Sequence, residues 1–173
     1  MSKVVFYGAI SLDGYLAGKH EDLDWLLQTQ VGEHTSYEEF IETIGTVVMG
    51  RITYEEALRL NNNQPLYPEQ NIVVFSRDQE TVDGQLTIHA DPVGYVQQLK
   101  TQEEKDIWIV GGGALLHPLL EANLIDEWFI QIAPVLLGEG KRLFEVHHLS
   151  TRLEFVETRQ FGELTELHYR KKA

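Results

Sequence analysis

Three consecutive glycines separate a strand pattern from a helix pattern, and this junction constrains the fold more than any other feature of the chain. Residues 107–110 read Ile-Trp-Ile-Val, residues 111–113 are glycine, and residues 114–121 have the spacing of a helix. Glycines at such a junction let a ligand phosphate approach bare backbone N–H groups at the positive end of the helix. The spelling fits neither GxGxxG nor a Walker A motif. The junction predicts a nucleotide site, and a tight turn that needs positive φ is the alternative.

Composition limits the classes to which the chain can belong. With 173 residues and 43% hydrophobic content, it suits one compact domain spanning residues 1–173. It has no cysteine, which excludes disulfides, thiol catalysis and cysteine metal sites. A formal net charge of −13 argues against a nucleic-acid partner, which requires a basic surface. We therefore expect the partner to be a small-molecule substrate.

The N-terminal residues lead directly into a strand pattern, without the apolar core or cleavage site of a signal peptide. No stretch approaches the ~18 continuous apolar residues of a membrane span. We therefore expect a cytoplasmic protein that does not act in a membrane.

Strand and helix patterns alternate along the first two thirds of the chain. Apolar strands are expected at 4–10, 46–49, 71–75, 86–89 and 107–110, and helices at 36–44, from 51 to about 60, 92–100 and 114–121. Ser36 with Glu39 predicts a capping box for the first helix, and Asp91 is expected to cap the third. This alternation predicts a parallel sheet covered on both faces. Strands at 127–137, 153–161 and 164–171 follow without a helix between them, so we expect an antiparallel edge.

Polar residues and glycines follow several of the expected strands. Ligands in open α/β sheets bind beyond the carboxyl ends of the strands. Two arginines, two hydroxyls and two helix N-termini are expected on one rim of an otherwise acidic protein, which suits a pyrophosphate and a further phosphate. The alternative reading takes each residue alone: an arginine here is typical of a solvated surface, one hydroxyl of a helix cap and the other of a turn. The segments that supply this rim are Asp13-Gly14, Gly50-Arg51-Ile52-Thr53, Ser76-Arg77 and Gly111-Gly112-Gly113.

The order and spelling of these segments resemble those of the dihydrofolate-reductase-like superfamily. The resemblance implies the three-layer α/β/α fold of that superfamily. The resemblance rests on residues 48–55 (VMGRITYE), 71–77 (NIVVFSR) and 110–113 (VGGG). Residues 11–17 and 133–144 resemble more specifically the branch typified by the reductase domain of the bacterial riboflavin-biosynthesis deaminase-reductase. The match covers nearly the whole chain, in order. The chain would be a free-standing relative of that domain, because it has no deaminase part.

The resemblance implies NADPH as cofactor. In the family, residues at the positions of Arg51 and Thr53 meet its pyrophosphate and adenosine phosphate, and those of Ser76 and Arg77 meet its 2′-phosphate. It further implies a cis peptide between the first two glycines and a place near the nicotinamide for the glycine of the first loop. Asp13, the acid of that loop, is a candidate for substrate contact or proton handling. The implied cofactor-binding residues are Gly14, Gly50, Arg51, Thr53, Ser76, Arg77, Gly111, Gly112, Gly113, Ala114 and Leu115.

One departure from the family bears on the substrate. Dihydrofolate reductases carry an acid at the start of the helix before the Met-Gly-Arg turn, and Ser36 stands there. Glu33 or Glu38 could replace it if the alignment slips by one helical turn. Hydride transfer to a pyrimidine ribosyl phosphate, such as 5-amino-6-(5-phosphoribosylamino)uracil, is therefore favoured over pterin reduction. A protein that binds the cofactor without turnover is the competing hypothesis.

Two further features concern metals and assembly. His147 and His148 are adjacent, so in an extended segment they point to opposite faces, and no metal site is expected. The strand at 127–137 is apolar enough to predict a homodimer through the antiparallel edge. The alternative is that helices and the final hairpin cover this strand within one chain.

Overall fold

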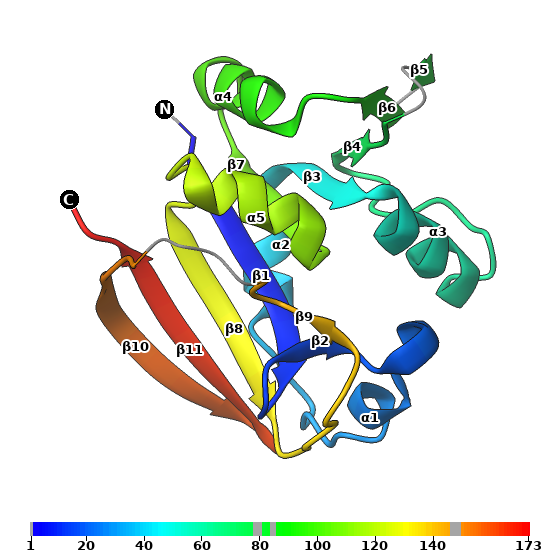
Figure 1. Ribbon diagram of the computed structural model, residues 1–173, viewed down its shortest axis with the longest axis vertical. Helices are drawn as coiled ribbons and strands as arrows, with labels where there is room; N and C mark the ends of the chain where they lie inside the picture. Colours follow the sequence, from blue (N-terminus) through cyan, green and yellow to red (C-terminus); the bar gives the residue numbers. More distant parts are fainter. Residues whose placement is uncertain (1, 78–80, 84–85, 146–149) are drawn as a thin grey trace.

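The computed structural model describes residues 2–77, 81–83, 86–145 and 150–173. Within these residues the main feature is a nine-stranded mixed sheet (Figure 1). From one edge to the other its strands are β10 (Leu153–Phe161), β11 (Leu164–Lys171), β8 (Glu127–Ala133), β1 (Val4–Ser11), β7 (Asp106–Gly111), β3 (Ile44–Gly50), β4 (Asn71–Phe75), β6 (Leu86–His89) and β5 (Thr81–Asp83). His147 and His148 lie outside the described residues.

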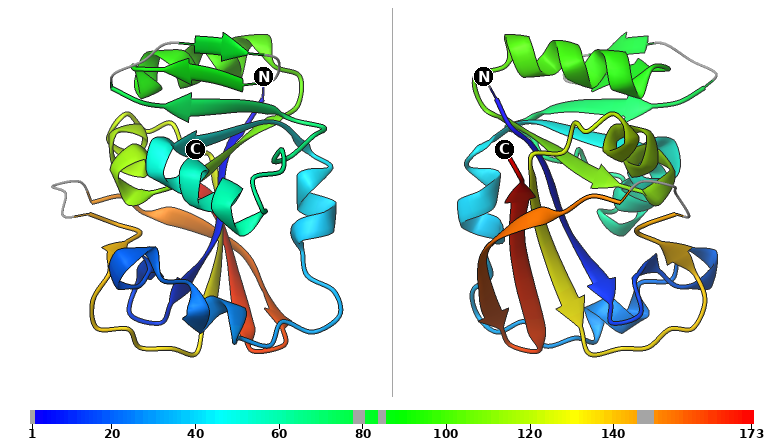
Figure 2. Two further views of the ribbon diagram at one scale, coloured as in Figure 1. Left: turned by 90° about the vertical axis from the view of Figure 1, so that its right-hand side faces the viewer. Right: turned by 60° about the vertical axis from the view of Figure 1, so that its left-hand side comes forward.

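Helices cover both faces of this sheet (Figures 1 and 2). Helices α4 (Pro92–Gln102) and α5 (Gly113–Glu121) pack on one face, and α2 (Tyr37–Ile41) and α3 (Arg51–Leu60) on the other. The oxygen Oδ1 of Asp91 accepts a hydrogen bond from the Gly94 N–H at 3.2 Å, which confirms the predicted cap of α4. In the part of the chain that the structure describes, no helix is both long and apolar enough to cross a membrane.

The strands alternate their side chains between two hydrophobic cores. In β1, Val4 and Phe6 pack with α4 and α5, whereas Val5 and Tyr7 pack with α2 and its neighbours. Both sets are buried, which explains why the central strands are apolar without interruption. The predicted three-layer arrangement is therefore confirmed.

The antiparallel part of the sheet begins one strand later than the sequence predicts. Strand β8 is parallel to β1 and antiparallel to β11, and β11 is antiparallel to β10. Helix α5 carries the chain from β7 across the sheet to β8, and a helical crossover places the next strand parallel. β8 also ends at Ala133 rather than at residue 137.

The position of β8 removes the argument that predicted a homodimer. β8 pairs with β1 on one side and with β11 on the other, so the final hairpin covers it within one chain. The edge strand here is β10, on which Phe155 is 60% exposed. A homodimer through this edge stays a prediction, and it would have to use β10.

Two short strands form a separate small sheet beside the main one. They are β2 (Tyr15–Ala17) and β9 (Lys141–Arg142), which pair antiparallel. The 3-10 helix η1 (Lys19–Glu21) and the short helix α1 (Asp24–Leu27) follow β2 in the chain. This small sheet, which the sequence did not predict, supplies residues to the cavity described below.

Candidate functional site

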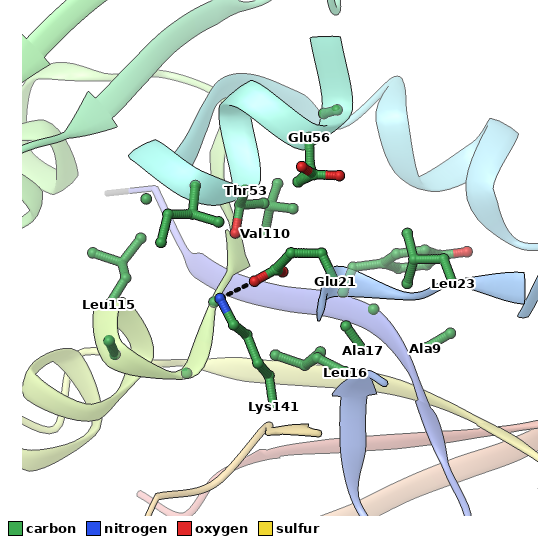
Figure 3. A pocket seen from close by; sticks show the side chains of 18 of the residues that line it. Ala9, Leu16, Ala17, Glu21, Leu23, Thr53, Glu56, Val110, Leu115 and Lys141 are labelled. Carbon is green, nitrogen blue, oxygen red and sulfur yellow. Dashed lines mark ion pairs between the residues drawn. The ribbon is translucent and has the colours of Figure 1, made fainter. Parts of the chain in front are cut away.

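A cavity of about 1290 Å³ lies beside the ends of β3, β4 and β7 and extends along β1 and β8 to the start of β11. Sites for drug-sized ligands typically measure about 300–1,000 Å³. This cavity therefore has room for a dinucleotide together with a small substrate. Figure 3 shows part of its lining, to which Thr53 of α3, Leu115 of α5 and Lys141 of β9 contribute.

Two helices begin at the cavity without a side-chain cap. The N-cap of α3 is Gly50 and that of α5 is Gly112, and neither helix start receives a side-chain hydrogen bond from its cap. A Cβ on Gly50 would lie 4.0 Å from the backbone nitrogen of Gly112, so the two helix starts face each other closely. Free N–H groups of two helices at one place form an anion-binding arrangement.

The fold requires glycine at two of the three consecutive positions. Gly111 has φ +119°, which side chains rarely adopt, and a Cβ on Gly113 would lie 2.5 Å from the Arg142 carbonyl oxygen. Gly112 has φ −75°, and its Cβ would meet only Thr53 Oγ1, at 3.8 Å. The fold thus accounts for Gly111 and Gly113 but would accept a side chain at Gly112. The peptide between Gly111 and Gly112 is cis, as the resemblance implied.

Basic side chains line the cavity although the protein has a formal net charge of −13. They are Arg51, Arg77, Lys141 and Arg142, and three carboxylates, Glu21, Glu56 and Glu145, line the cavity with them. Lys141 forms an ion pair with Glu21, which also lines the cavity (Figure 3). Guanidinium and ammonium groups beside uncapped helix starts favour a phosphorylated ligand.

A buried polar cluster forms the opposite end of the cavity. Ser36 and Gln131 line the cavity, and the Glu166 carboxylate lies behind them, only 2% exposed. Both side chains donate hydrogen bonds to Oε2 of Glu166, the Gln131 bond measuring 2.7 Å. The hydroxyl of Tyr7, also in the lining, lies 2.9 Å from Ser36 Oγ. Burial raises the pKa of Tyr7 to about 12, so this phenol stays protonated.

Comparison with known proteins decides the family. The sequence profile of the RibD C-terminal domain matches residues 2–167. The chain belongs to the RibD C-terminal domain family. The uncharacterized protein YwjB of Bacillus subtilis (strain 168) is similar to it, with 34% identity over 96% of this chain and 97% of YwjB.

Solved structures agree with the RibD C-terminal domain assignment. A Shewanella sp. PV-4 protein assigned to riboflavin biosynthesis has a TM-score of 0.86 and 28% identity, and all of both chains is covered. The dihydrofolate reductase of Enterococcus faecalis, complexed with NADP(H), has a TM-score of 0.66 and 17% identity over 98% of this chain and 97% of that one. The latter likeness shows the dihydrofolate-reductase-like fold.

Most residues that the sequence assigned to the cofactor lie together in this RibD-type domain. Gly111 adjoins the cavity, and Gly14 lies in a turn outside its lining, where φ is +95° and the N–H donates to the Ser11 carbonyl oxygen at 3.0 Å. The roles of all these residues stay predictions. Those that line the cavity are Gly50, Arg51, Thr53, Ser76, Arg77, Gly112, Gly113, Ala114 and Leu115.

Hydrogen bonds hold the Asp13 carboxylate in the turn after β1. It is absent from the cavity lining, and its Oδ1 accepts from Ser11 Oγ at 2.7 Å and its Oδ2 from the Gly138 N–H at 2.8 Å. These hydrogen bonds lower the pKa of Asp13 to about 2. The carboxylate therefore joins the turn after β1 to the loop after β8, and its role in substrate contact or proton handling stays a prediction.

Sequence reasoning also missed the role of Ser36. Ser36 is the N-cap of α2 but makes no capping bond, because its hydroxyl donates to Glu166 instead. Neither Glu33 nor Glu38 lines the cavity. The sequence carries one signal for Glu166, which stands two residues after Leu164 in a strand pattern, in the phase that the structure shows to be buried. A charged residue in the inward phase of a strand indicates a buried polar site.

Proposed function

We propose that this protein is an NADPH-dependent reductase. The observation that carries the proposal is Gly112, where the fold accepts a side chain but the sequence has none, at a gap between two uncapped helix starts. Because glycine has no side chain, a pyrophosphate could approach the backbone N–H groups closely at this gap. Membership in the RibD C-terminal domain family supports the proposal.

Different residues of the cavity would hold different parts of the cofactor. The N-termini of α3 and α5, with Arg51 and Thr53, would hold the pyrophosphate, and Ser76 with Arg77 would hold the 2′-phosphate. NADPH supplies the hydride when it is bound, and the protein orients both reactants and excludes water. Gly8 and Ala9 of β1 line the cavity between the phosphate end and the Ser36 cluster. We place the nicotinamide beside them.

The substrate would then occupy the cavity end formed by Ser36 and Gln131. We propose a small heterocyclic or ribosyl-type compound, with 5-amino-6-(5-phosphoribosylamino)uracil as the representative. The riboflavin-biosynthesis assignment of the Shewanella relative supports this class. Since Asp13 lies outside the cavity, we expect the proton that accompanies hydride transfer to come from water.

Pterin reduction is the second candidate, because a carboxylate lies close to the substrate end. Glu166 is separated from the cavity by Ser36 and Gln131, so it cannot protonate a ring directly. We therefore expect a pterin to be a poor substrate.

The test is NADPH oxidation followed by absorbance, with aminouracil ribosyl phosphates, pterins and simple carbonyl compounds as substrates. The proposal expects the fastest turnover with the aminouracil compounds. NADPH binding without oxidation of any compound would favour the hypothesis of a cofactor-binding protein. Absence of NADPH binding would reject both.

A further inference from the structure

Two side chains that line the cavity form an ion pair with each other. Oε1 of Glu21 contacts the Lys141 ammonium, and Figure 3 shows the two side chains pointing toward each other. Arg51, by contrast, pairs at 3.7 Å with Glu55, which lies outside the lining. The ammonium of Lys141 is therefore already neutralised by a carboxylate of the same cavity.

Strand β9 holds the backbone of Lys141 in place. Lys141 pairs with Ala17 of β2, and a Cβ on the preceding Gly140 would lie 2.2 Å from the Ala17 carbonyl oxygen. The next residue, Arg142, packs its carbonyl oxygen so closely on Gly113 that a Cβ there would lie 2.5 Å away. Gly113 is the first residue of α5. The base of the Lys141 side chain is therefore fixed beside the start of this helix.

The carboxylate of the pair stands on a segment that is held less firmly. Glu21 is the last residue of the 3-10 helix η1, in which no residue is buried. His20 and Glu21 have φ values of +58° and +61°, a region that residues with a side chain seldom occupy. Displacement of the Glu21 side chain would therefore disturb no part of the hydrophobic core.

A phosphate group can compete with Glu21 for the ammonium. The side chains of Glu21 and Lys141 are 26% and 49% exposed, and ion pairs at such partly exposed sites contribute little to stability. A phosphate monoester carries more negative charge than a carboxylate and has more acceptor oxygens. It could also meet the N–H groups at the start of α5, where no side chain caps the helix. The exchange would therefore replace a weak internal pair with a stronger pair to the ligand.

We propose that Lys141 binds a phosphate group of the ligand and that Glu21 is its internal competitor, which holds the ammonium until the phosphate takes its place. Because β9 is fixed and η1 is not, the ammonium stays in the cavity when the carboxylate leaves. The contact with Glu21 therefore lowers the affinity for every ligand whose phosphate reaches Lys141. This inference rests on the proposed function in that the phosphate belongs to the proposed cofactor or to the proposed substrate.

Calorimetric titration with NADPH and, separately, with ribose 5-phosphate tests the proposal and identifies the source of the phosphate. Glu21→Gln removes the competing charge and should tighten binding roughly two- to fivefold, which is the worth of a partly exposed ion pair. Lys141→Met should weaken binding of the same ligand about tenfold. A gain with NADPH assigns the phosphate to the cofactor, and a gain with ribose 5-phosphate assigns it to the substrate. No gain with either ligand would overturn the proposal.

Removal of any negative charge from the cavity could tighten the binding of an anion, so two controls are included. Glu56→Gln is the matched variant, because Glu56 also lines the cavity but pairs at 2.8 Å with Arg59, which lies outside the lining. It should leave affinity nearly unchanged. In a Lys141→Met background, Glu21→Gln should give no gain, since there is no ammonium to release. An equal gain from Glu56→Gln, or a gain that persists without Lys141, would indicate simple repulsion and refute the proposal.

Failure of the proposed function would give a different result. If ribose 5-phosphate shows the gain and its dependence on Lys141, but no form of the protein binds NADPH, the proposed reductase is contradicted and this inference stands. If the wild-type protein binds NADPH but neither ligand responds to Glu21→Gln, the proposed function stands and this inference is rejected.

Discussion

The pair of substitutions Gly112→Ala and Gly113→Ala separates cofactor binding from folding, because both add one methyl group at neighbouring positions. At Gly112 the new Cβ would lie 3.8 Å from Thr53 Oγ1, an ordinary contact, and φ is −75°. At Gly113 it would lie 2.5 Å from the Arg142 carbonyl oxygen, a distance that forces the backbone to move. Gly112→Ala is therefore expected to weaken NADPH binding with little loss of stability, whereas Gly113→Ala is expected to lower stability.

The magnitudes follow from these contacts. Gly112→Ala should change the free energy of unfolding by no more than about 0.5 kcal/mol, or stabilise slightly by reducing the entropy of the unfolded chain. Overpacking at Gly113 should cost about 1–3 kcal/mol. If the methyl group at Gly112 prevents two charge-assisted hydrogen bonds of about 1.5–3 kcal/mol each, NADPH affinity should fall at least about 100-fold.

Urea unfolding and NADPH fluorescence titration measure the two effects on the same preparations. A Gly112→Ala protein with wild-type stability and wild-type NADPH affinity would refute the reasoning, since the glycines would then serve only the turn. A Gly112→Ala protein that loses several kcal/mol would show instead that its methyl group does not fit the fold.

Four further predictions concern specificity, acid stability, substrate and assembly. Arg77→Ala should weaken NADPH binding about tenfold or more and leave NADH binding unchanged, as titration of both cofactors would show. The pKa of Asp13 lies at about 2 in the folded protein, below the ordinary aspartate value of 3.8, so its stabilising effect is present above pH ~4 and is lost as the pH falls toward 2. Asp13→Asn should therefore lower stability in neutral-pH urea unfolding, flatten the acid dependence in that window and leave NADPH affinity unchanged. Dihydrofolate should be reduced slowly, because a directly placed acid is typically worth about 10²–10⁴ in rate; fast reduction at neutral pH would imply proton transfer from Glu166 through Ser36. Light scattering at micromolar concentration should give the mass of a dimer, and a charged residue in place of Phe155 should dissociate it if β10 forms the interface; a monomeric mass would reject this prediction.

The sequence predicts the sheet and the end of the cavity lined by glycines and arginines because their signals are local. Strands buried on both faces are continuous apolar runs, and residues 46–49, 71–75 and 107–110 all lie in the central strands. The glycines of residues 111–113 and the Arg51–Thr53 turn adjoin such strands directly. Parallel strands bring their carboxyl ends to one edge, so these motifs converge without further information.

The substrate end depends on contacts between distant parts of the chain, and these contacts override local patterns. Ser36 and Glu39 have the spacing of a capping box, yet the Ser36 hydroxyl bonds Glu166, 130 residues away. Asp13 looks like a free loop acid, yet it binds the Gly138 N–H, 125 residues away. The direction of β8 likewise depends on the crossover of α5. One sequence, read without an alignment, does not reveal such pairings.

Transfer of a labelled hydride tests the central claim most directly. The protein is incubated with NADPH carrying deuterium at the transferred position of the nicotinamide and with 5-amino-6-(5-phosphoribosylamino)uracil, and the product is analysed by mass spectrometry. We predict a reduced product with one carbon-bound deuterium, formed by wild-type protein and not by Gly112→Ala. A product without deuterium, or no product from a protein that binds both compounds, would contradict the account.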